Sequence, residues 1–253
     1  MTSKDSYNDC RISVENLEVI VNRSRIILIN KYTVGRGLHL ILGPNGAGKT
    51  TFLKILSGIM PPGSGSVSVC GDKPRQVRDM IGYLPALPEV DPLATVENVI
   101  EAGLYDSSIE DESEAINEAI RLVGISQLVG RRFNTLSSGE QRLVCIARVL
   151  ARRPRILLLD ELFNFLDISN KERIFRIVRE YTVRNNAITL VTTHEIYYAG
   201  LFDTVTVLRK GDIIFHGRPE NLGEKILHSA YGIGIISLRV KGKTLFLPRH
   251  LVE

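Results

Sequence analysis

A glycine-rich stretch of eight residues constrains most strongly what this chain can fold into. It reads Gly43-Pro44-Asn45-Gly46-Ala47-Gly48-Lys49-Thr50, after the apolar run 38–42 and before the run 51–56. The spacing matches G-x-x-x-x-G-K-[ST], in which backbone N–H groups surround a nucleotide phosphate at a helix N-terminus. It predicts a strand, a phosphate-binding loop and a helix. A glycine turn that only links two elements would not need Lys-Thr at the helix start.

Each residue type in this loop has a predicted task. The glycines let the backbone approach the phosphates and take positive φ. Lys49 is expected to bridge the β- and γ-phosphates, and the Thr50 hydroxyl to ligate Mg²⁺. The predicted nucleotide-binding residues are Gly43, Pro44, Asn45, Gly46, Ala47, Gly48, Lys49, Thr50 and Thr51.

Length and composition favour one large domain. The chain has 253 residues, of which 44% are hydrophobic, and its net charge of +4 is spread along the sequence, so charge alone identifies no partner. No apolar run reaches the roughly 18 residues of a membrane span, and the polar stretch 1–9 lacks the apolar core of a signal peptide. Cys10, Cys70 and Cys145 share no C-x-x-C spacing, which supports neither a disulfide nor a zinc site and favours a reducing compartment.

Hydrophobic periodicity predicts an α/β fold. Apolar and polar residues largely alternate over 11–30, which indicates antiparallel strands. Helical spacing dominates 95–150. The continuous apolar runs 156–159 and 187–191 flank a helix that Ser169 and Glu172 are expected to cap, so a mostly parallel sheet is predicted. Two hairpins, over 204–215 and 235–247, follow. Ligands are expected at the carboxyl ends of the parallel strands.

Two adjacent carboxylates end the buried strand 156–159. Burying the charges of Asp160 and Glu161 at this strand end costs free energy, which favours a functional role for them. An acidic residue after four apolar ones is the Walker B pattern, in which Asp160 would hold Mg²⁺ and Glu161 would polarise the attacking water. Taken alone, the two acidic residues could also be a polar cap at the end of the strand. The phosphate-binding loop in the same chain favours the catalytic interpretation.

Four ordered motifs resemble the ATP-binding subunit of ABC transporters. They are the loop 43–50, the stretch Leu136-Ser137-Ser138-Gly139-Glu140-Gln141, the strand end 156–161, and His194 after Thr192-Thr193. The second is similar to the family's L-S-G-G-Q signature, which other phosphate-loop families lack. The resemblance covers about 11–222. It implies an α/β P-loop NTPase with a RecA-like, mostly parallel sheet core, an N-terminal antiparallel β subdomain and an inserted helical subdomain at about 87–153. The whole chain, 1–253, would be a single ABC-type ATP-binding domain with a small C-terminal β extension at about 228–253.

The resemblance also implies residue roles and partners. The signature of one subunit would close over the ATP of a second, so a homodimer or heterodimer is expected; the signature residues are Leu136, Ser137, Ser138, Gly139 and Glu140. His194 would contact the γ-phosphate and, with Glu161 and Lys49, form the catalytic set. Thr50 and Asp160 would hold Mg²⁺. The other implied partner is an integral membrane permease, with no nucleic acid, and the location is cytoplasmic at the inner face of the cell membrane.

Three positions depart from the family pattern. Ala86 stands where the family has a glutamine that contacts Mg²⁺ and signals to the membrane domain. Phe165 stands where a small residue precedes Leu-Asp, although Leu166 and Asp167 match. Val21 stands where an aromatic residue would stack on adenine.

The sequence therefore predicts an ATP-binding, ATP-hydrolysing subunit that energises transport through a separate transmembrane permease. One alternative is a soluble ABC-type ATPase that acts on DNA or ribosomes. Such a protein would be expected to contain a long coiled-coil insertion or two fused ATPase domains. Another is a regulatory ABC subunit with weak hydrolysis, which Ala86 and Phe165 favour. A phosphate-loop kinase would leave the stretch 136–141 unexplained. The cargo and its direction would be set in the permease.

Overall fold

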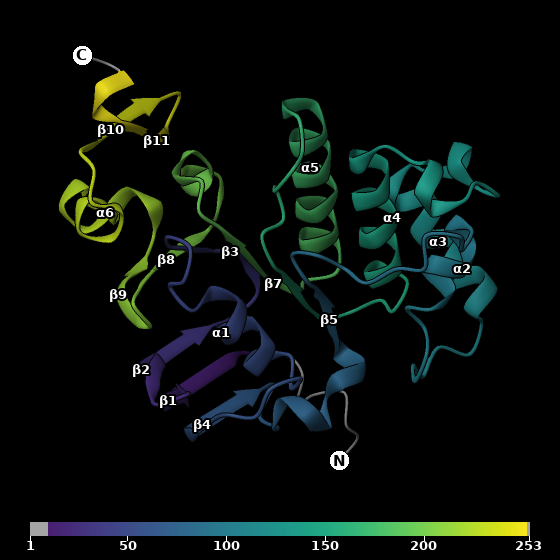
Figure 1. The fold of residues 1–253 in the computed structure, drawn as a ribbon, viewed down its shortest axis with the longest axis horizontal. Helices are drawn as coiled ribbons and strands as arrows, with labels where there is room; N and C mark the ends of the chain where they lie inside the picture. The colour runs from purple at the N-terminus through teal and green to yellow at the C-terminus, as the bar shows by residue number, and fades with distance from the viewer. Residues whose placement is uncertain (1–9, 252–253) are drawn as a thin grey trace.

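One nine-stranded sheet organises the molecule, and the computed structural model describes residues 10–251 of it (Figure 1). The stretches 1–9 and 252–253 lie outside the described residues, and so does the segment to which the signal-peptide expectation applies. The strand order is β4-β1-β2-β9-β8-β3-β7-β6-β5. The strands are β1 (Ile12–Val21), β2 (Ser24–Val34), β3 (Gly37–Leu42), β4 (Ser64–Val69), β5 (Ile81–Leu84), β6 (Ile156–Leu159), β7 (Ile188–Thr193), β8 (Thr204–Arg209), β9 (Asp212–Gly217), β10 (Ile235–Val240) and β11 (Lys243–Pro248). The helices are α1 (Lys49–Leu56), α2 (Val96–Glu101), α3 (Glu112–Val123), α4 (Ser138–Leu150), α5 (Ile168–Arg184) and α6 (Glu224–Tyr231).

Parallel pairing in the centre of the sheet confirms the predicted core. β3 lies between β7 and β8 and is parallel to both, and β6 is parallel to β5 and β7. The predicted N-terminal antiparallel layer is also present, because β1 pairs antiparallel with β2 and β4. A parallel contact of β2 with β9 at Leu28 and Asp212 joins this layer to the core in one sheet.

The run Ile156–Leu159 shows why the core strands contain almost no polar residues. Ile156 and Leu158 belong to the apolar cluster on one face of the sheet, with α1 and the N-terminal strands. Leu157 and Leu159 belong to the cluster on the other face, with α2 to α5. A strand covered on both faces excludes polar side chains, and the first polar residue after this run comes where the strand leaves the sheet.

Helices α2, α3 and α4 all lie in the chain between β5 and β6, and Figure 1 shows them together on one side of α5. Thr95 caps α2, since its hydroxyl accepts from the N–H of Asn98. The predicted cap of α5 is wrong. Asp167 caps this helix and accepts from the N–H of Asn170, because the chain already turns into the helix at Ile168.

Cys10 and Cys70 form a disulfide, which corrects the expectation from their spacing. They are 60 residues apart in sequence, but their Cα atoms lie 4.2 Å apart. The cause is strand pairing, because Ile12 at the start of β1 lies opposite Val69 at the end of β4. Spacing rules detect only cysteines that are close in sequence. Cys145 is free and buried in α4.

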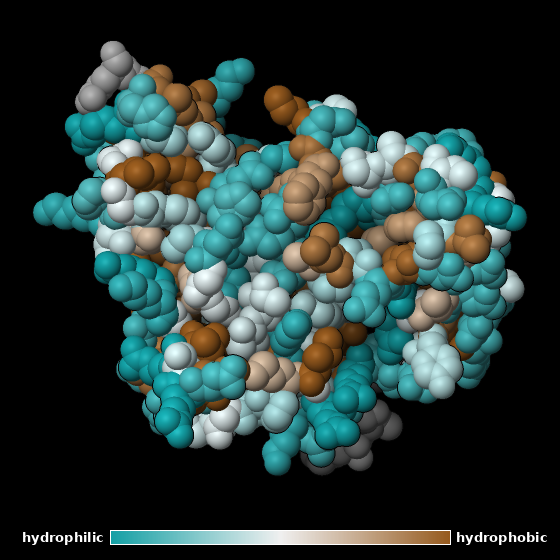
Figure 2. Space-filling model, in the orientation of Figure 1, coloured by the Kyte–Doolittle hydropathy of each residue, from teal (hydrophilic) through white to brown (hydrophobic). Residues whose placement is uncertain are grey.

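The C-terminal part contains α6 and the hairpin β10–β11, which Figure 1 shows at one edge of the molecule. The buried Phe246 of β11 anchors the hairpin to the larger apolar cluster. On the face shown in Figure 2, apolar surface occurs as small groups between polar ones. Within residues 10–251, no helix has the length and apolar character needed to cross a membrane.

Candidate functional site

The phosphate-binding loop lies between β3 and α1, and two of its glycines are required by geometry. Gly48 caps α1 with φ of 100°, a conformation that residues with a side chain rarely adopt. A Cβ at Gly43 would lie 2.5 Å from the carbonyl oxygen of Leu208. The loop is anchored by the N–H of Gly211, which donates to the carbonyl oxygen of Ala47 at 3.1 Å.

The predicted loop residues differ in exposure. Asn45, Gly46 and Thr50 are exposed, and Pro44 and Thr51 are half-buried, whereas Ala47 lies in the core. An anion at the start of α1 would therefore meet exposed backbone groups and the Thr50 hydroxyl.

Lys49 is the buried cation of the site, with only 5% of its surface exposed. Its Nζ donates to the carbonyl oxygens of Gly43 and Pro44 at 2.7 and 3.2 Å. The same atom lies 3.1 Å from Oε1 of Glu161. The ammonium group thus links the phosphate-binding loop to the end of β6.

A threonine bridge holds the two predicted carboxylates at that strand end. Leu159 of β6 lies opposite Val191 of β7, so the residues that follow them meet across the strand pair. The Thr192 hydroxyl donates to Oδ1 of Asp160 at 2.6 Å and accepts the backbone N–H of Glu161 at 2.8 Å. The neighbouring strand therefore orients the Asp160 carboxylate and fixes the backbone of Glu161.

Glu161 lies between Lys49 and His194. Its Oε2 is 3.2 Å from Nδ1 of His194, whose side chain is 44% exposed. Its backbone has φ of 44°, in the left-handed region. Such a conformation costs a non-glycine residue on the order of 1–3 kcal/mol and is found preferentially at functional sites. The structure therefore brings Lys49, Asp160, Glu161 and His194 together at the carboxyl ends of three parallel strands.

Oxygen atoms without partners make this site suitable for a small cation. Oδ2 of the fully buried Asp160 and the hydroxyl of Tyr83 find no hydrogen-bond partner among the described residues. Burial, with the negative charge of Asp160, raises the pKa of the Tyr83 hydroxyl. Within 10–251, no cluster of three or more His, Cys, Asp or Glu side chains could hold a metal. The donors fit Mg²⁺, which is commonly held by one or two carboxylates together with nucleotide phosphates.

The predicted signature forms the N-terminus of α4. Ser137 is its N-cap, Gly139 is buried and Ser138 is exposed. Glu140 accepts from the N–H and hydroxyl of Ser137 at 2.8 and 2.9 Å, and these hydrogen bonds lower the pKa of its carboxyl. Leu136 is buried just before the helix. Among the described residues, no hydrogen bond or ion pair joins 136–140 to the phosphate-binding loop.

Comparison with known proteins decides the family. Residues 32–164 match the family model described as ABC transporter. The hemin import ATP-binding protein HmuV of Rhodococcus jostii is 33% identical over 224 residues, 83% of this chain and 76% of that protein. The chain belongs to the ABC transporter family of ATP-binding proteins.

Other ABC proteins support the same assignment. The energy-coupling factor transporter ATP-binding protein EcfA1 of Methanospirillum hungatei is 33% identical over 186 residues, 70% of this chain and 67% of that protein. The solved structure of CbiO1 from Clostridium perfringens, part of the transporter complex cbiONQ, superposes with a TM-score of 0.75 at 26% identity. That match covers 87% of this chain and 94% of CbiO1. ATP-binding domains of this family are in general ATPases.

Two departures from the ABC pattern meet in one cavity. Ala86 and Phe165 both line a space of about 210 Å³ beside α4. Phe165 is 79% exposed and has φ of 62°. Val21, the third departure, lies exposed at the end of β1, where the chain turns into β2. The sequence pattern alone did not indicate that the first two positions are neighbours.

We expect Ala86→Gln to preserve or raise ATP hydrolysis. Leu84 at the end of β5 lies opposite Leu159, so Ala86 follows the strand next to the one that ends in Asp160, and an amide at this position could orient Mg²⁺ and water. Steady-state phosphate release measures the effect. Ala86→Met is the matched control, since it has similar length without the amide. A severe loss of activity in Ala86→Gln with the fold intact would contradict the assigned place of this loop.

Arg142 is the main residue of the site that sequence reasoning missed. It is buried on α4 and donates to the backbone carbonyl oxygens of Asp160 and Glu161. A signal existed, because Cys145, Ile146 and Val149 follow at helical spacing on the same buried face. A second missed residue is Tyr231 of α6, whose buried hydroxyl faces the backbone N–H of Gly43 and has its pKa raised by burial.

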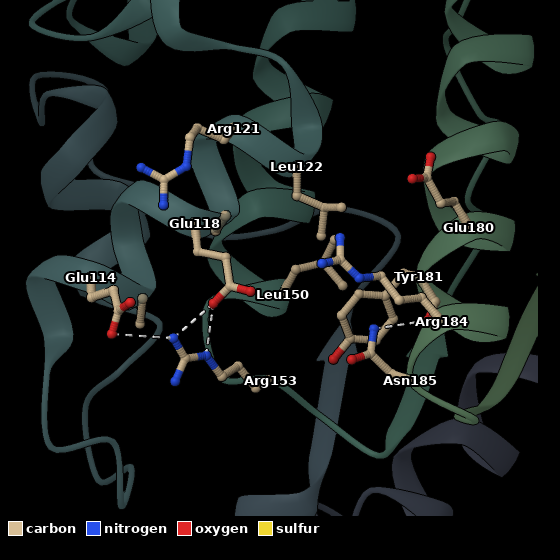
Figure 3. Close-up of a pocket in the computed structure, with 12 residues that line it drawn as sticks. Glu114, Glu118, Arg121, Leu122, Leu150, Arg153, Glu180, Tyr181, Arg184 and Asn185 are labelled. Atoms are coloured by element: carbon tan, nitrogen blue, oxygen red, sulfur yellow. Dashed lines mark hydrogen bonds and ion pairs between the residues drawn. The ribbon is translucent and has the colours of Figure 1, made fainter.

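A separate cavity of about 660 Å³ lies between α3, α5 and the end of α4 (Figure 3). Arg153 reaches between Glu118 and Glu114, at 2.7 and 3.9 Å, so its charge is already paired. None of the predicted site residues lines this cavity. It is therefore no candidate for the nucleotide site.

Proposed function

We propose that this ABC protein hydrolyses ATP to energise transport through a separate membrane permease. The observation that carries the proposal is the meeting of two groups, an ammonium and an imidazole, at one carboxylate. Lys49 Nζ and His194 Nδ1 lie 3.1 and 3.2 Å from the two carboxylate oxygens of Glu161. A cation for the phosphates, a base for water and a histidine beside it are the parts that phosphoryl transfer to water needs.

In the proposed reaction, Lys49 exchanges its contact with Glu161 for the β- and γ-phosphates. Glu161 then accepts a proton from the attacking water, whose oxygen forms the new bond to the γ-phosphorus. The bond from that phosphorus to the β-phosphate's bridging oxygen breaks, and ADP leaves. His194, exposed on one side, donates to the γ-phosphate and keeps the water beside Glu161. The backbone N–H groups of 43–50 carry the remaining phosphate charge.

Mg²⁺ is the cofactor that the site supports. The Thr50 hydroxyl and Oδ2 of Asp160 would hold it, directly or through water, because the first is exposed at the start of α1 and the second has no protein partner. Bound there, it would neutralise charge on the β- and γ-phosphates.

A second ATP-binding subunit would complete the site. The exposed Ser137 and Ser138 lie at the N-terminus of the 13-residue helix α4, where the helix dipole favours an anion. In the partner's site this helix end would contact the γ-phosphate. The Ser137 hydroxyl would then donate to the phosphate in place of the Glu140 carboxylate.

We propose one ABC-type ATP-binding domain over 1–253, with the helical subdomain at about 87–153 and the C-terminal extension at about 228–253. The chain would work in the cytoplasm, bound to the permease at the inner face of the membrane. The hemin import and energy-coupling factor names of its relatives support a transport role. Phosphate release from Mg-ATP by the purified chain tests the enzymatic part of the proposal. No release, either alone or with the permease, would contradict it.

We expect the permease to dock in a groove of about 580 Å³ beside the loop after β5. The apolar side chains of Leu87, Tyr105 and Ile59 line it and are largely exposed. A photocrosslinker at Leu87 should reach an integral membrane protein in solubilised membranes. The same probe at Val183, which is 71% exposed on α5, is the control. Adducts only with ribosomes or DNA would overturn the transport role.

A further inference from the structure

Arg142 carries a buried positive charge that the proposed chemistry does not use. It lies in the second turn of α4, and only 7% of its surface is exposed. Burial lowers the pKa of its guanidinium, and the neighbouring charges of Asp160 and Glu161 oppose that shift. No carboxylate among the described residues forms an ion pair with it. A charge kept in such a place needs many hydrogen bonds.

Five carbonyl oxygens supply those hydrogen bonds. Nη1 donates to Pro85 and Ala86 at 3.2 and 3.3 Å. Nη2 donates to Asp160 and Glu161 at 3.0 and 3.2 Å, and Nε donates to Leu162 at 3.3 Å. All three nitrogens of the guanidinium fork are therefore used. Its planar donors can satisfy this arrangement, whereas the single ammonium group of lysine cannot span both loops.

The five carbonyls belong to two separate loops. Residues 85–86 follow β5, and 160–162 follow β6, which is parallel to β5 and next to it. The second loop contains Asp160 and Glu161, and Glu161 has the left-handed backbone conformation. Arg142 itself belongs to α4, whose first turn is the predicted signature. One side chain thus joins the signature helix to the backbone of Asp160 and Glu161.

We propose that Arg142 is the positioning residue that fixes the Asp160–Glu161 backbone relative to the signature helix. It does so by hydrogen bonding to the carbonyls of both loops. Any shift of α4 that follows contact of its N-terminus with the partner's nucleotide is passed by this guanidinium to the subunit's own Glu161. The inference rests on the proposed ATPase function and adds a link between the two faces of the subunit.

The test compares three variants of the full-length chain. Arg142→Met keeps the length of the side chain and removes every donor, and Arg142→Lys keeps the charge but reaches fewer carbonyls. Arg148→Met is the matched control. Arg148 is on the same helix and donates to the carbonyl oxygen of Glu89 at 3.2 Å, but it makes no hydrogen bond to 160–162. Each variant is assayed for kcat and KM of ATP hydrolysis and for equilibrium binding of a fluorescent ADP analogue.

Arg142→Met should lower kcat on the order of 10- to 100-fold, the loss typical when a group that orients a reactive side chain is removed. KM and ADP-analogue binding should stay close to the parent values, since Lys49 and the phosphate-binding loop are untouched. Arg142→Lys should recover part of kcat, and Arg148→Met should match the parent. A general structural role would instead weaken nucleotide binding and thermal stability together.

Two results would overturn the proposal. One is a folded Arg142→Met protein with the parent kcat, and the other is an equal loss in Arg148→Met. If Arg142→Met does not fold, a folded Arg142→Lys protein with the parent kcat also overturns it, whereas a reduced kcat with unchanged ADP-analogue binding supports it. Failure of the ATPase assignment itself would show differently, as a parent protein without hydrolysis.

Discussion

Glu161→Gln should slow ATP turnover by on the order of 10²-fold or more, while nucleotide binding persists. The amide keeps the size and one acceptor of the carboxylate but cannot take a proton from water. Its partners remain in place, because Lys49 still contacts the carbonyl of Gly43 and Thr192 still holds the backbone N–H of Glu161. Single-turnover hydrolysis with Mg-ATP measures the loss directly.

The same substitution should trap a closed dimer. Lys49, Thr50 and Asp160 would still hold Mg-ATP, and Ser137 and Gly139 would still present the opposite face. ATP that is not hydrolysed then stays as a ligand between two subunits, and light scattering with and without Mg-ATP should show the mass of a dimer. A Glu161→Gln protein that stays monomeric and hydrolyses at the parent rate would refute the assigned role. A slow monomer would instead point to Phe165 or to a different partner subunit.

Lys49→Ala should behave differently, with loss of both tight nucleotide binding and ATP-dependent dimerisation. The ammonium group is a charged donor to the phosphates, and removing one hydrogen bond to a charged group costs roughly 1.5–3 kcal/mol, or on the order of 10- to 100-fold in affinity. The substitution also removes hydrogen bonds within the protein, since Lys49 Nζ donates to the carbonyl oxygens of Gly43 and Pro44. Glu161 would then lack its cationic partner.

Titration with a fluorescent ATP analogue separates these effects, and Lys54→Ala is the matched control. Lys54 is also on α1 but exposed, away from the buried contacts of Lys49. The control should bind nucleotide as the parent does. If Lys49→Ala kept the parent affinity, the phosphate site would not lie at this loop.

Local chemistry determined what the sequence could predict by itself. The loop 43–50 was recognisable because a tight backbone, a lysine and a hydroxyl must occur at one spacing, whatever surrounds them. The α/β order was also readable, since strands buried on both faces exclude polar residues, as in 156–159. The parallel pairing of β3, β6 and β7 then places 43–50, Asp160-Glu161 and His194 at one edge of the sheet.

Tertiary structure decided which side chains meet. The hydroxyl of Thr192 bridges to Asp160, a cavity brings Ala86 beside Phe165, and a disulfide joins Cys10 to Cys70. Arg142 reaches two loops that are 57 and 18 residues away from it in the chain. Periodicity reports that a position is buried, but not which distant segment covers it. Partners of this kind follow from strand register and helix packing, which form only when the whole chain has folded.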